Sequence, residues 1–374
     1  MEFKKVILIF AFWRILLFIA TFLCLLIPLN SHHFLGGSFD NYNFNPFVFG
    51  WANFDGEHYL SIAQKGYGHY NHSFFPVYPL ILGLIKFLTD NISILVWWGI
   101  IISNISFLAA LFFLKKLTDL DFPKKVSYLI LLSLIIFPTS FYFGAVYTES
   151  LFLFLVVSSF YAARTNRWYL AGVLGAFAST TRIVGVILLP ALILEYFQMQ
   201  KEKSFKSLSP LFLIPLGLMF YMVFLLNETG NPFAFYSELS VYGEQRAGDL
   251  ILLPQVFYRY LKILTNVDII NPVFQTALLE LGSAILAIAC IIYGFFKKIR
   301  LSYIVFAAVS FLIPTFTGSF SSLPRYFLTI FPLFIAIGIF VERSSLIFKI
   351  LVSLLVLSLL MFETMLFLRG YFIA

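Results

Sequence analysis

The chain has 374 residues, of which 61% are hydrophobic and only 11% are charged, whereas an average soluble domain carries roughly 25% charged residues. This composition excludes a soluble globular protein and indicates a single integral membrane domain over residues 1–374. The formal net charge of +7 does not imply a nucleic-acid partner, because the basic residues lie in short segments between apolar runs, as membrane topology requires. The lipid bilayer is therefore the first partner that the composition implies.

Apolar runs recur along the whole chain and predict an all-α, polytopic fold, because about 17–25 apolar residues in a helix span a bilayer. We expect about eleven transmembrane helices, at residues 6–29, 93–114, 126–138, 146–163, 168–181, 183–197, 208–226, 271–296, 301–317, 325–341 and 346–368. Segment 76–88 is too short to cross, since thirteen helical residues rise only about 20 Å. Pro76 and Pro79 suit the start of a short helix at the outer membrane surface.

Lysines and arginines between these spans predict the orientation of the chain. They cluster at residues 4–5, 115–125, 164–167, 201–206, 297–300 and 343–349. With eleven spans, all of these clusters and the N-terminus face the cytoplasm. Two long loops, residues 30–92 and 227–270, then lie on the extracytoplasmic side. The first is expected to contain short interfacial helices, and it holds all five histidines: His32, His33, His58, His69 and His72.

The first candidate for chemistry is Asp55, in the sequence NFDGEHY. Gly56 permits a turn, which can direct the Asp55 carboxylate toward the membrane surface. A partly desolvated carboxylate is more basic and can remove a proton from a hydroxyl group. The alternative is that Asp55 only caps a helix over residues 57–65, and the spacing does not decide between the two.

Glu149 is the second candidate, in PTSFYFGAVYTESLFLF, where a short outer loop enters an apolar helix. Acidic and hydroxyl residues are ordinary at a helix N-terminus, so a purely structural role is the alternative. Glu149 is nevertheless expected on the same side of the membrane as Asp55. A common site is therefore possible.

Arg182 and Arg325 each lie beside apolar segments at the outer side, in STTRIVG and SSLPRYFL. Charged residues at membrane depth are costly and are candidates for function, and the planar guanidinium group suits phosphate oxygens. The alternatives are an internal ion pair with a carboxylate and a side chain that extends to the interface. Lys65 and Arg246 are weaker candidates for the same role.

The histidines show no ligand spacing typical of a tightly bound metal, since His69 and His72 lie in a turn rich in tyrosine and glycine. A loosely held divalent cation that bridges a phosphate to Asp55 or Glu149 remains open. No other cofactor is implied.

Five segments in order resemble one known family: WANFDGEHYLSIAQKGY, FFPVYPL, PTSFYFGAVYTESLFLF, TTRIVGV and PRYFLTIFPLF. They look like the PIG-V mannosyltransferases, within the GT-C superfamily of glycosyltransferases that use lipid-phosphate sugars. The resemblance implies inverting transfer from a polyprenyl-phosphate sugar to an acceptor hydroxyl on the outer face of the membrane. It implies that Asp55 is the catalytic base, and Glu149 matches a second acidic position of the family. Both are therefore candidate catalytic residues.

The candidate substrate-binding residues are Glu57, His58, Lys65, His72, Arg182, Arg246, Arg325 and Tyr326. Expected partners are the donor, a glycan, glycolipid or other hydroxyl acceptor, and a further membrane subunit. The short chain and its composition predict that the protein lies in a prokaryotic plasma membrane. A GPI-anchor acceptor is therefore not expected. Two other functions stay open: a flippase or transporter for lipid-linked sugars, and an accessory subunit without activity.

Overall fold

The computed structural model describes residues 2–30, 35–68, 70–199, 205–238, 251–269 and 271–373. Within these ranges every regular element is helical. In chain order they are α1 (Glu2–Leu23), η1 (Cys24–Leu26), α2 (Phe39–Phe44), α3 (Pro46–Phe49), η2 (Gly50–Ala52), α4 (Asp55–Lys65), α5 (Val77–Lys86), α6 (Ile92–Thr118), α7 (Lys124–Ile136), η3 (Ser140–Gly144), α8 (Glu149–Arg164), α9 (Trp168–Thr181), η4 (Ile183–Ile187), α10 (Leu188–Met199), α11 (Phe205–Leu208), η5 (Ser209–Phe212), α12 (Leu213–Thr229), α13 (Ala234–Ser237), α14 (Leu253–Asn266), α15 (Pro272–Phe296), α16 (Leu301–Thr315), α17 (Leu323–Thr329), α18 (Phe331–Arg343) and α19 (Leu346–Leu368).

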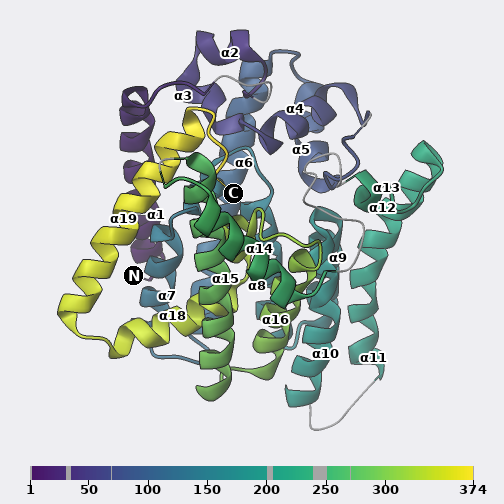
Figure 1. Cartoon of the computed structure of the whole chain (residues 1–374). Helices are drawn as coiled ribbons and strands as arrows, with labels where there is room; N and C mark the ends of the chain where they lie inside the picture. The colour runs from purple at the N-terminus through teal and green to yellow at the C-terminus, as the bar shows by residue number, and fades with distance from the viewer. Residues whose placement is uncertain are drawn as a thin grey trace.

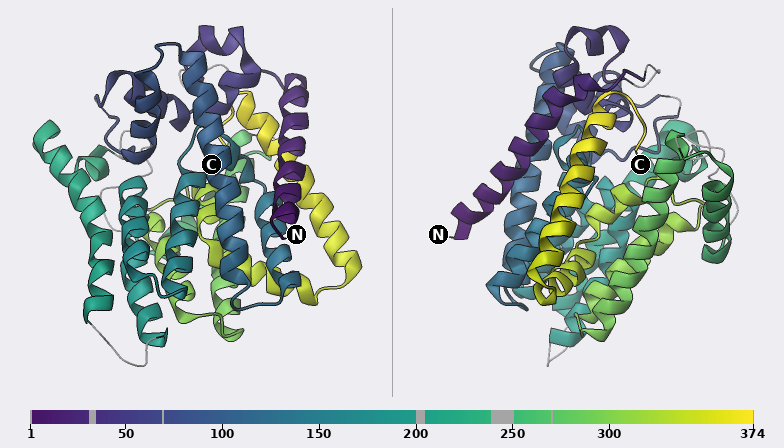
Figure 2. Two further views of the ribbon diagram at one scale, coloured as in Figure 1. Left: turned by 180° about the vertical axis from the view of Figure 1, so that it is seen from behind. Right: turned by 60° about the vertical axis from the view of Figure 1, so that its left-hand side comes forward.

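The long helices run roughly side by side, and the short helices α2–α5 sit together at the upper end in Figure 1. The α1 and α19 helices pack against each other at one edge, while α12 stands at the opposite edge in both Figure 1 and Figure 2. The exposed faces of α1 and α19 are apolar, with Leu8 and Leu351 each more than 60% exposed. Such faces suit contact with lipid rather than water.

Each of the eleven expected ranges contains a helix or a pair of helices, so the all-α prediction is confirmed. Among the described residues, five helical segments are long and apolar enough to cross a membrane alone. These are Glu2–Leu26, Ile92–Thr118, Ser209–Thr229, Pro272–Phe296 and Leu346–Leu368. The crossing of the shorter helices, and with it the total of eleven, stays a prediction.

The segment expected as one span at residues 325–341 is the clearest correction to the sequence analysis. It consists of α17 and α18, which meet at an angle of 82°. Pro332 lies at the second position of α18, where the missing N–H of proline costs nothing because the first turn of a helix has no internal acceptor. The break gives α17 its own direction.

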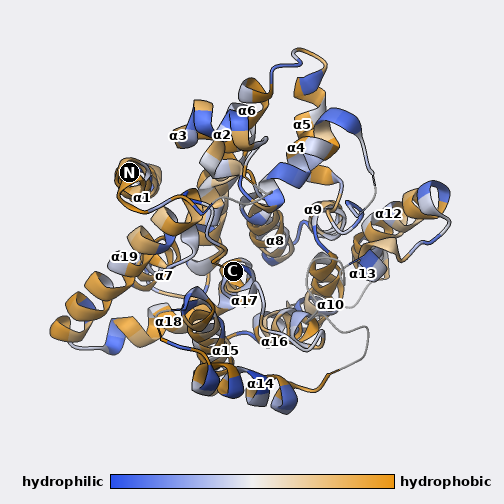
Figure 3. Cartoon of the chain, turned by 45° about the horizontal axis from the view of Figure 1, so that its top comes forward, coloured by the Kyte–Doolittle hydropathy of each residue, from blue (hydrophilic) through white to orange (hydrophobic). Residues whose placement is uncertain are grey.

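Two smaller differences concern the outer loops. Residues 146–148 precede α8, which begins only at Glu149. No helix was predicted in the second loop, which contains α13 and the strongly amphipathic α14. Figure 3 shows mixed polar and apolar colour along α14 and α4, against the mainly apolar long helices. The expected short helix near residues 76–88 is confirmed as α5, which spans ten residues.

Basic segments gather at the end of the bundle opposite α2–α5. The Lys124 side chain pairs with Glu2, and Lys125 pairs with Glu342 at 3.1 Å. These pairs join the start of α7 to the start of α1 and to the last turn of α18. These pairs place the starts of α1 and α7 and the end of α18 at one end of the molecule, while the orientation of the chain in the membrane stays a prediction.

Candidate active site

A cavity of about 510 Å³ lies where the first outer loop meets the upper ends of the bundle helices. One wall is polar and charged, and the other is apolar. Its lining residues include Phe54, Asp55, His58, Tyr59, Phe74, Thr148, Arg182, Ile183, Val184, Phe235, Tyr236, Ile313, Pro314, Thr317, Ser322, Arg325, Tyr326, Ile330 and Phe372. The C-terminal residues end near the centre of the molecule, beside this cavity (Figure 1).

Four charged residues from four distant parts of the sequence meet at the polar wall. Arg325 Nη1 donates to Asp55 Oδ2, and Arg325 Nε lies 3.4 Å from Glu149 Oε1. Arg182 Nη1 donates to the same Glu149 oxygen at 2.5 Å. We call this set, Asp55, Glu149, Arg182 and Arg325, the outer cluster. Its two carboxylates and two guanidinium groups alternate in one chain of ion pairs.

The members of the outer cluster differ in their access to the cavity. The Asp55 side chain is 28% exposed, whereas that of Glu149 is only 1% exposed. Asp55, Arg182 and Arg325 line the cavity, but Glu149 does not. Glu149 therefore lies behind the two arginines, and a buried carboxylate in this place fixes the position of both guanidinium groups.

Asp55 is the first residue of α4, and it does not cap that helix. The N-cap is Phe54, with φ 57° and ψ −117°, and its side chain makes no cap hydrogen bond. A residue with a side chain is strained in this conformation, which costs on the order of 1–3 kcal/mol and is typical of functional sites. Asp55 is therefore in the first turn of α4 and is not its N-cap residue.

Packing holds this strained turn in place. Asn53 Nδ2 donates to the Phe367 carbonyl at 2.9 Å, and Tyr147 donates its hydroxyl proton to the Asn53 carbonyl at 2.9 Å. A Cβ atom on Gly56 would lie 3.3 Å from the Val146 carbonyl oxygen, so only glycine leaves comfortable room here. The Phe-Asp-Gly sequence thereby brings α4 close to the segment that leads into Glu149.

Arg325 owes its position to the break between α17 and α18. Ser322, just before α17, has φ 65°, and its backbone N–H donates to Glu280 Oε1 at 3.2 Å. Tyr260 donates to the other oxygen of Glu280 at 2.5 Å. This buried carboxylate therefore anchors the N-terminal end of α17, which carries the guanidinium group into the cavity wall.

A family model described as Mannosyltransferase (PIG-V) matches residues 3–231, which is more than half of the 374 residues. The chain belongs to the PIG-V mannosyltransferase family. The long apolar helices and this family together show an integral membrane protein.

Three solved structures, all from Archaeoglobus fulgidus, are also similar to the chain. The crystal structure of its oligosaccharyltransferase tethered with an acceptor peptide containing the NVT sequon shares 14% identity and a TM-score of 0.45, and the match covers 96% of this chain and 55% of that one. The apo form of that oligosaccharyltransferase shares 14% identity and a TM-score of 0.45, and the match covers 97% of this chain and 56% of that one. The archaeal oligosaccharyltransferase AglB in complex with an inhibitory peptide and a dolichol-phosphate shares 15% identity and a TM-score of 0.41, and the match covers 99% of this chain and 56% of that one. The chain thus spans little more than half the length of these enzymes. No protein of curated function matches it significantly, and the family model alone carries the assignment.

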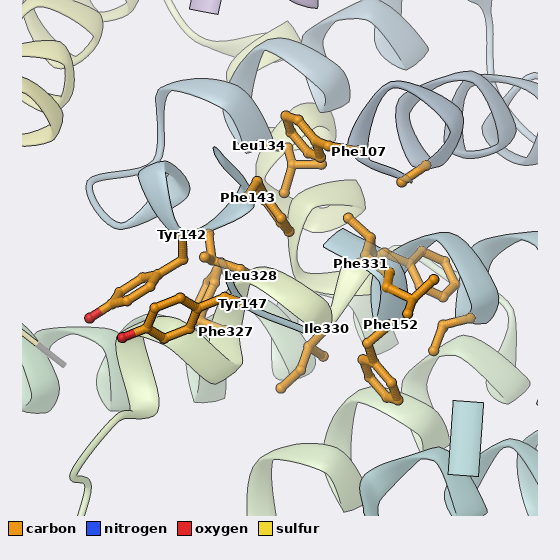
Figure 4. Close-up of a cluster of buried hydrophobic side chains, with 14 of the residues drawn as sticks. Phe107, Leu134, Tyr142, Phe143, Tyr147, Phe152, Phe327, Leu328, Ile330 and Phe331 are labelled. Atoms are coloured by element: carbon orange, nitrogen blue, oxygen red, sulfur yellow. The ribbon is translucent and has the colours of Figure 1, made fainter. Parts of the chain in front are cut away.

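The arginines of this PIG-V family member rest on aromatic rings. The Arg325 guanidinium carbon lies 5.7 Å from the Tyr142 ring centroid and 5.5 Å from that of Tyr147. Tyr326 lies between the two cations, 5.0 Å from Arg182 and 5.6 Å from Arg325. Figure 4 shows Tyr142 and Tyr147 side by side next to the buried aromatic core. Guanidinium groups in ion pairs and on aromatic rings keep their charge without free water.

For Arg182 and Arg325, phosphate binding and an internal ion pair were predicted from the sequence as alternative roles. In the structure the ion pair does not remove either residue from the cavity. Both arginines form internal ion pairs with carboxylates. They also line the cavity with Tyr326, so the ion pairs place them in the cavity wall rather than away from it.

Among the other predicted site residues, His58 lines the cavity. Its Nδ1 lies 2.9 Å from Asn71 Oδ1, and its ring stacks on Phe74 with centroids 4.5 Å apart. Lys65 is exposed in the last turn of α4 and does not line the cavity. Arg246 lies outside the described residues.

Glu57 does not line the cavity, although it is only two residues from Asp55. Its Oε2 atom is buried and makes no hydrogen bond to any described residue. Burial raises the pKa of the Glu57 carboxyl to about 7. Glu57 is thus a poorly satisfied carboxyl group next to the site rather than a member of it.

His72 joins the two outer loops instead of lining the cavity. Its Nδ1 lies 2.7 Å from Glu238 Oε1, and its backbone N–H donates to Glu238 Oε2 at 3.1 Å. Ser73 donates to the Phe235 carbonyl at 3.1 Å. These bonds hold α13, with the cavity residues Phe235 and Tyr236, against the first outer loop.

Sequence reasoning expected apolar spans to form a lipid groove but did not identify the residues of the apolar wall or the C-terminal contact of the cavity. Ile183, Ile313 and Pro314 lie in segments that were predicted only as spans, and Phe372 lies after the last span. Pro314, inside α16, was the one available signal, because a proline near a helix end often marks irregular backbone.

The donor set does not fit a resident divalent cation. Among the described residues, no group of three or more His, Cys, Asp or Glu side chains is close enough to hold a metal ion. Asp55 and Glu149 already pair with guanidinium groups. Positive charge in this cavity is supplied by arginine.

Proposed function

We propose that this protein is a membrane mannosyltransferase that moves the sugar of a polyprenyl-phosphate donor to an acceptor hydroxyl group with inversion. One observation carries the proposal: a single cavity joins a carboxylate, Asp55, to two guanidinium groups, Arg182 and Arg325, beside an apolar wall. A lipid-phosphate sugar needs these three features together. The family assignment supports the same reaction.

In the proposed mechanism, Arg325 and Arg182 bind the donor phosphate through their planar forks. The acceptor oxygen attacks the anomeric carbon, the bond from that carbon to the phosphate oxygen breaks, and Asp55 takes the hydroxyl proton. The arginines neutralise the negative charge that develops on the leaving phosphate. A single displacement, in which the acceptor attacks the face of the anomeric carbon opposite the leaving phosphate, gives inversion, and one carboxylate suffices as the base.

Glu149 does not touch the substrate in this mechanism. We assign it to the positioning of both arginines, because it contacts both and does not line the cavity. This refines the expectation that Glu149 is catalytic. Ile183, Ile313 and Pro314 supply apolar contacts for the first isoprene units of the donor.

The orientation argument supports an extracytoplasmic site. The basic connections lie at the end of the bundle opposite α2–α5, and basic loops face the cytoplasm in most membrane proteins. We therefore propose that the cavity faces the outside of a prokaryotic plasma membrane. Labelling of a single cysteine introduced at exposed Asp40, in the first outer loop, by a membrane-impermeant reagent on intact cells tests this; protection there would reverse the orientation.

The function is tested by transfer with the full chain in liposomes. Radiolabelled polyprenyl-phosphate mannose is supplied with a panel of hydroxyl acceptors, and wild type is compared with Asp55→Asn and with Asp40→Asn. Asp40 is an exposed acidic residue of the same loop that does not line the cavity. We expect transfer by wild type and Asp40→Asn and a large loss of transfer by Asp55→Asn. Equal transfer by all three proteins would refute Asp55 as the base, and movement of donor across the bilayer without transfer would indicate a transporter.

A further inference from the structure

Arg325 contacts two carboxylates that differ in accessibility. Asp55 lines the cavity and is 28% exposed, whereas Glu149 is 1% exposed and is also bound by Arg182 at 2.5 Å. A ligand that enters the cavity can therefore replace Asp55 at the guanidinium group of Arg325. It cannot reach Glu149 without displacing both arginines.

The charges of the outer cluster favour such a replacement. Among the described residues, its two carboxylates and two guanidinium groups balance in formal charge, so an anion that enters the cavity meets guanidinium groups that are already paired. A phosphate group that approaches Arg325 is also repelled by the Asp55 carboxylate bound there. Arg325 lines the cavity and borders both Asp55 and Tyr326, so the competition takes place at this residue.

We propose that the donor phosphate and Asp55 compete for Arg325, so that donor binding releases Asp55 to act as the base. This inference rests on the proposed function. In the free protein, the Asp55 carboxylate accepts a hydrogen bond from Arg325. When the phosphate occupies Arg325, this ion pair breaks and the Asp55 carboxylate can accept the proton of the acceptor hydroxyl group. Donor therefore binds before productive acceptor, and the base is masked until the donor is present.

The charge balance of the reaction extends the same competition to product release. The acceptor proton moves to Asp55 as the bond to the acceptor oxygen forms and the bond to the phosphate oxygen breaks. Asp55 becomes neutral while the phosphate group of the released lipid gains one negative charge, so the total charge is unchanged. Neutral Asp55 cannot pair with Arg325. Once Asp55 loses its proton, the restored Asp55–Arg325 pair displaces the lipid phosphate.

The test uses farnesyl phosphate as a soluble isoprenyl phosphate and farnesol as its uncharged control. Binding of both to the detergent-purified full chain is measured by calorimetry at pH 8 for wild type, Asp55→Asn and Asp40→Asn. We expect Asp55→Asn to bind farnesyl phosphate at least about fivefold tighter than wild type, because its competitor for Arg325 is gone. Farnesol affinity should be equal in all three proteins, and Asp40→Asn should match wild type for both ligands.

The outcomes separate this inference from the proposed function. If Asp55→Asn loses transfer but binds farnesyl phosphate no tighter than wild type, the competition is refuted while the base assignment stands. If it keeps transfer, the base assignment itself fails. An equal gain in Asp40→Asn would show that only the net charge of the loop matters, and would also refute the competition. Should Asp55→Asn fail to fold, Asp55→Ser carries the same expectation.

Discussion

Each end of the helical bundle holds an ion-pair cluster of two carboxylates and two arginines. At the end opposite the cavity, Arg164 binds Asp121 with both terminal nitrogens, at 2.5 and 2.9 Å. Arg300 binds Asp121 at 3.1 Å and Glu195 at 2.9 Å. We call Asp121, Arg164, Glu195 and Arg300 the inner cluster. It has the composition and the net charge of the outer cluster.

The clusters differ in how completely their carboxylates are satisfied. Ser302 and Tyr303 add hydrogen bonds to Glu195 and Asp121, so each of the four carboxylate oxygens of the inner cluster accepts at least one bond. In the outer cluster, Glu149 Oε2 is buried and accepts no hydrogen bond from any described residue. None of the inner residues lines the cavity. The same ionic composition therefore lines a cavity at one end of the bundle and lies away from that cavity at the other.

The largest effect is expected for equivalent substitutions of the two aspartates. Asp55→Asn should lower the rate of transfer about 10²–10⁴-fold, because the acceptor proton loses its base. Asp121→Asn should lower thermal stability and leave transfer per folded molecule within about twofold. Transfer assays paired with unfolding curves in detergent measure both. A large loss of transfer in folded Asp121→Asn would remove the functional distinction between the clusters.

The two buried glutamates should behave alike in stability and differ in activity. Glu149→Gln and Glu195→Gln each leave an arginine short of a partner, which costs about 3–5 kcal/mol of unfolding free energy when the pair is buried. Only Glu149→Gln should also reduce kcat, by about tenfold or more, since Arg182 and Arg325 lose their shared anchor. Glu149→Asp should restore part of kcat. If Glu149→Gln changes stability alone, its positioning role is absent.

A smaller effect is expected when arginine is replaced by lysine, which keeps the charge but not the planar fork. Arg325→Lys should reduce kcat/KM by about tenfold, because two phosphate oxygens can no longer be bound in one plane. Arg300→Lys, at a position 31% exposed in the inner cluster, should change it less than about twofold. Kinetics at several donor concentrations distinguish the two variants, and equal behaviour would argue against a phosphate contact at Arg325.

The smallest effect is expected for Glu57, a carboxyl group that, unlike those of the two clusters, forms no ion pair with any described residue. Burial raises the pKa of the Glu57 carboxyl to about 7. The folded protein therefore keeps its full free energy of unfolding at low pH, where Glu57 is protonated, and loses part of it as the pH rises through 7 and the buried carboxyl ionises. Glu57→Gln should therefore match wild type near pH 4.5 and exceed it above pH 7, by on the order of 1 kcal/mol after solvent screening. Melting temperatures from pH 5 to 8 measure the difference. A constant difference across this range would contradict the raised pKa.

The helices and the four residues of the outer cluster could be predicted from sequence patterns. In a chain with 11% charged residues, each charge beside an apolar run stands out, because its burial is costly. Asp55, Glu149, Arg182 and Arg325 were all visible in this way. The apolar runs placed the helices because their length is set by the bilayer and not by distant contacts.

The pairing within each cluster depends on tertiary structure. Asp55 and Arg325 are 270 positions apart, and no local pattern shows that they touch or that Glu149 lies behind them. The 82° break before α18 had a signal in Pro332, but the surrounding apolar run suggested one continuous span. The inner cluster was overlooked because its arginines lie in basic loops, where topology already explains them.

The strained conformation of Phe54 has a consequence for protein engineering. Its φ of 57° favours glycine, so Phe54→Gly relieves backbone strain while it removes a ring that packs against Phe367 and Phe372. A substitution that relaxes this turn to stabilise the protein would let the Asp55 side chain move more freely. We expect such a variant to gain stability and to lose turnover. Substitutions chosen for melting temperature alone should therefore spare this turn.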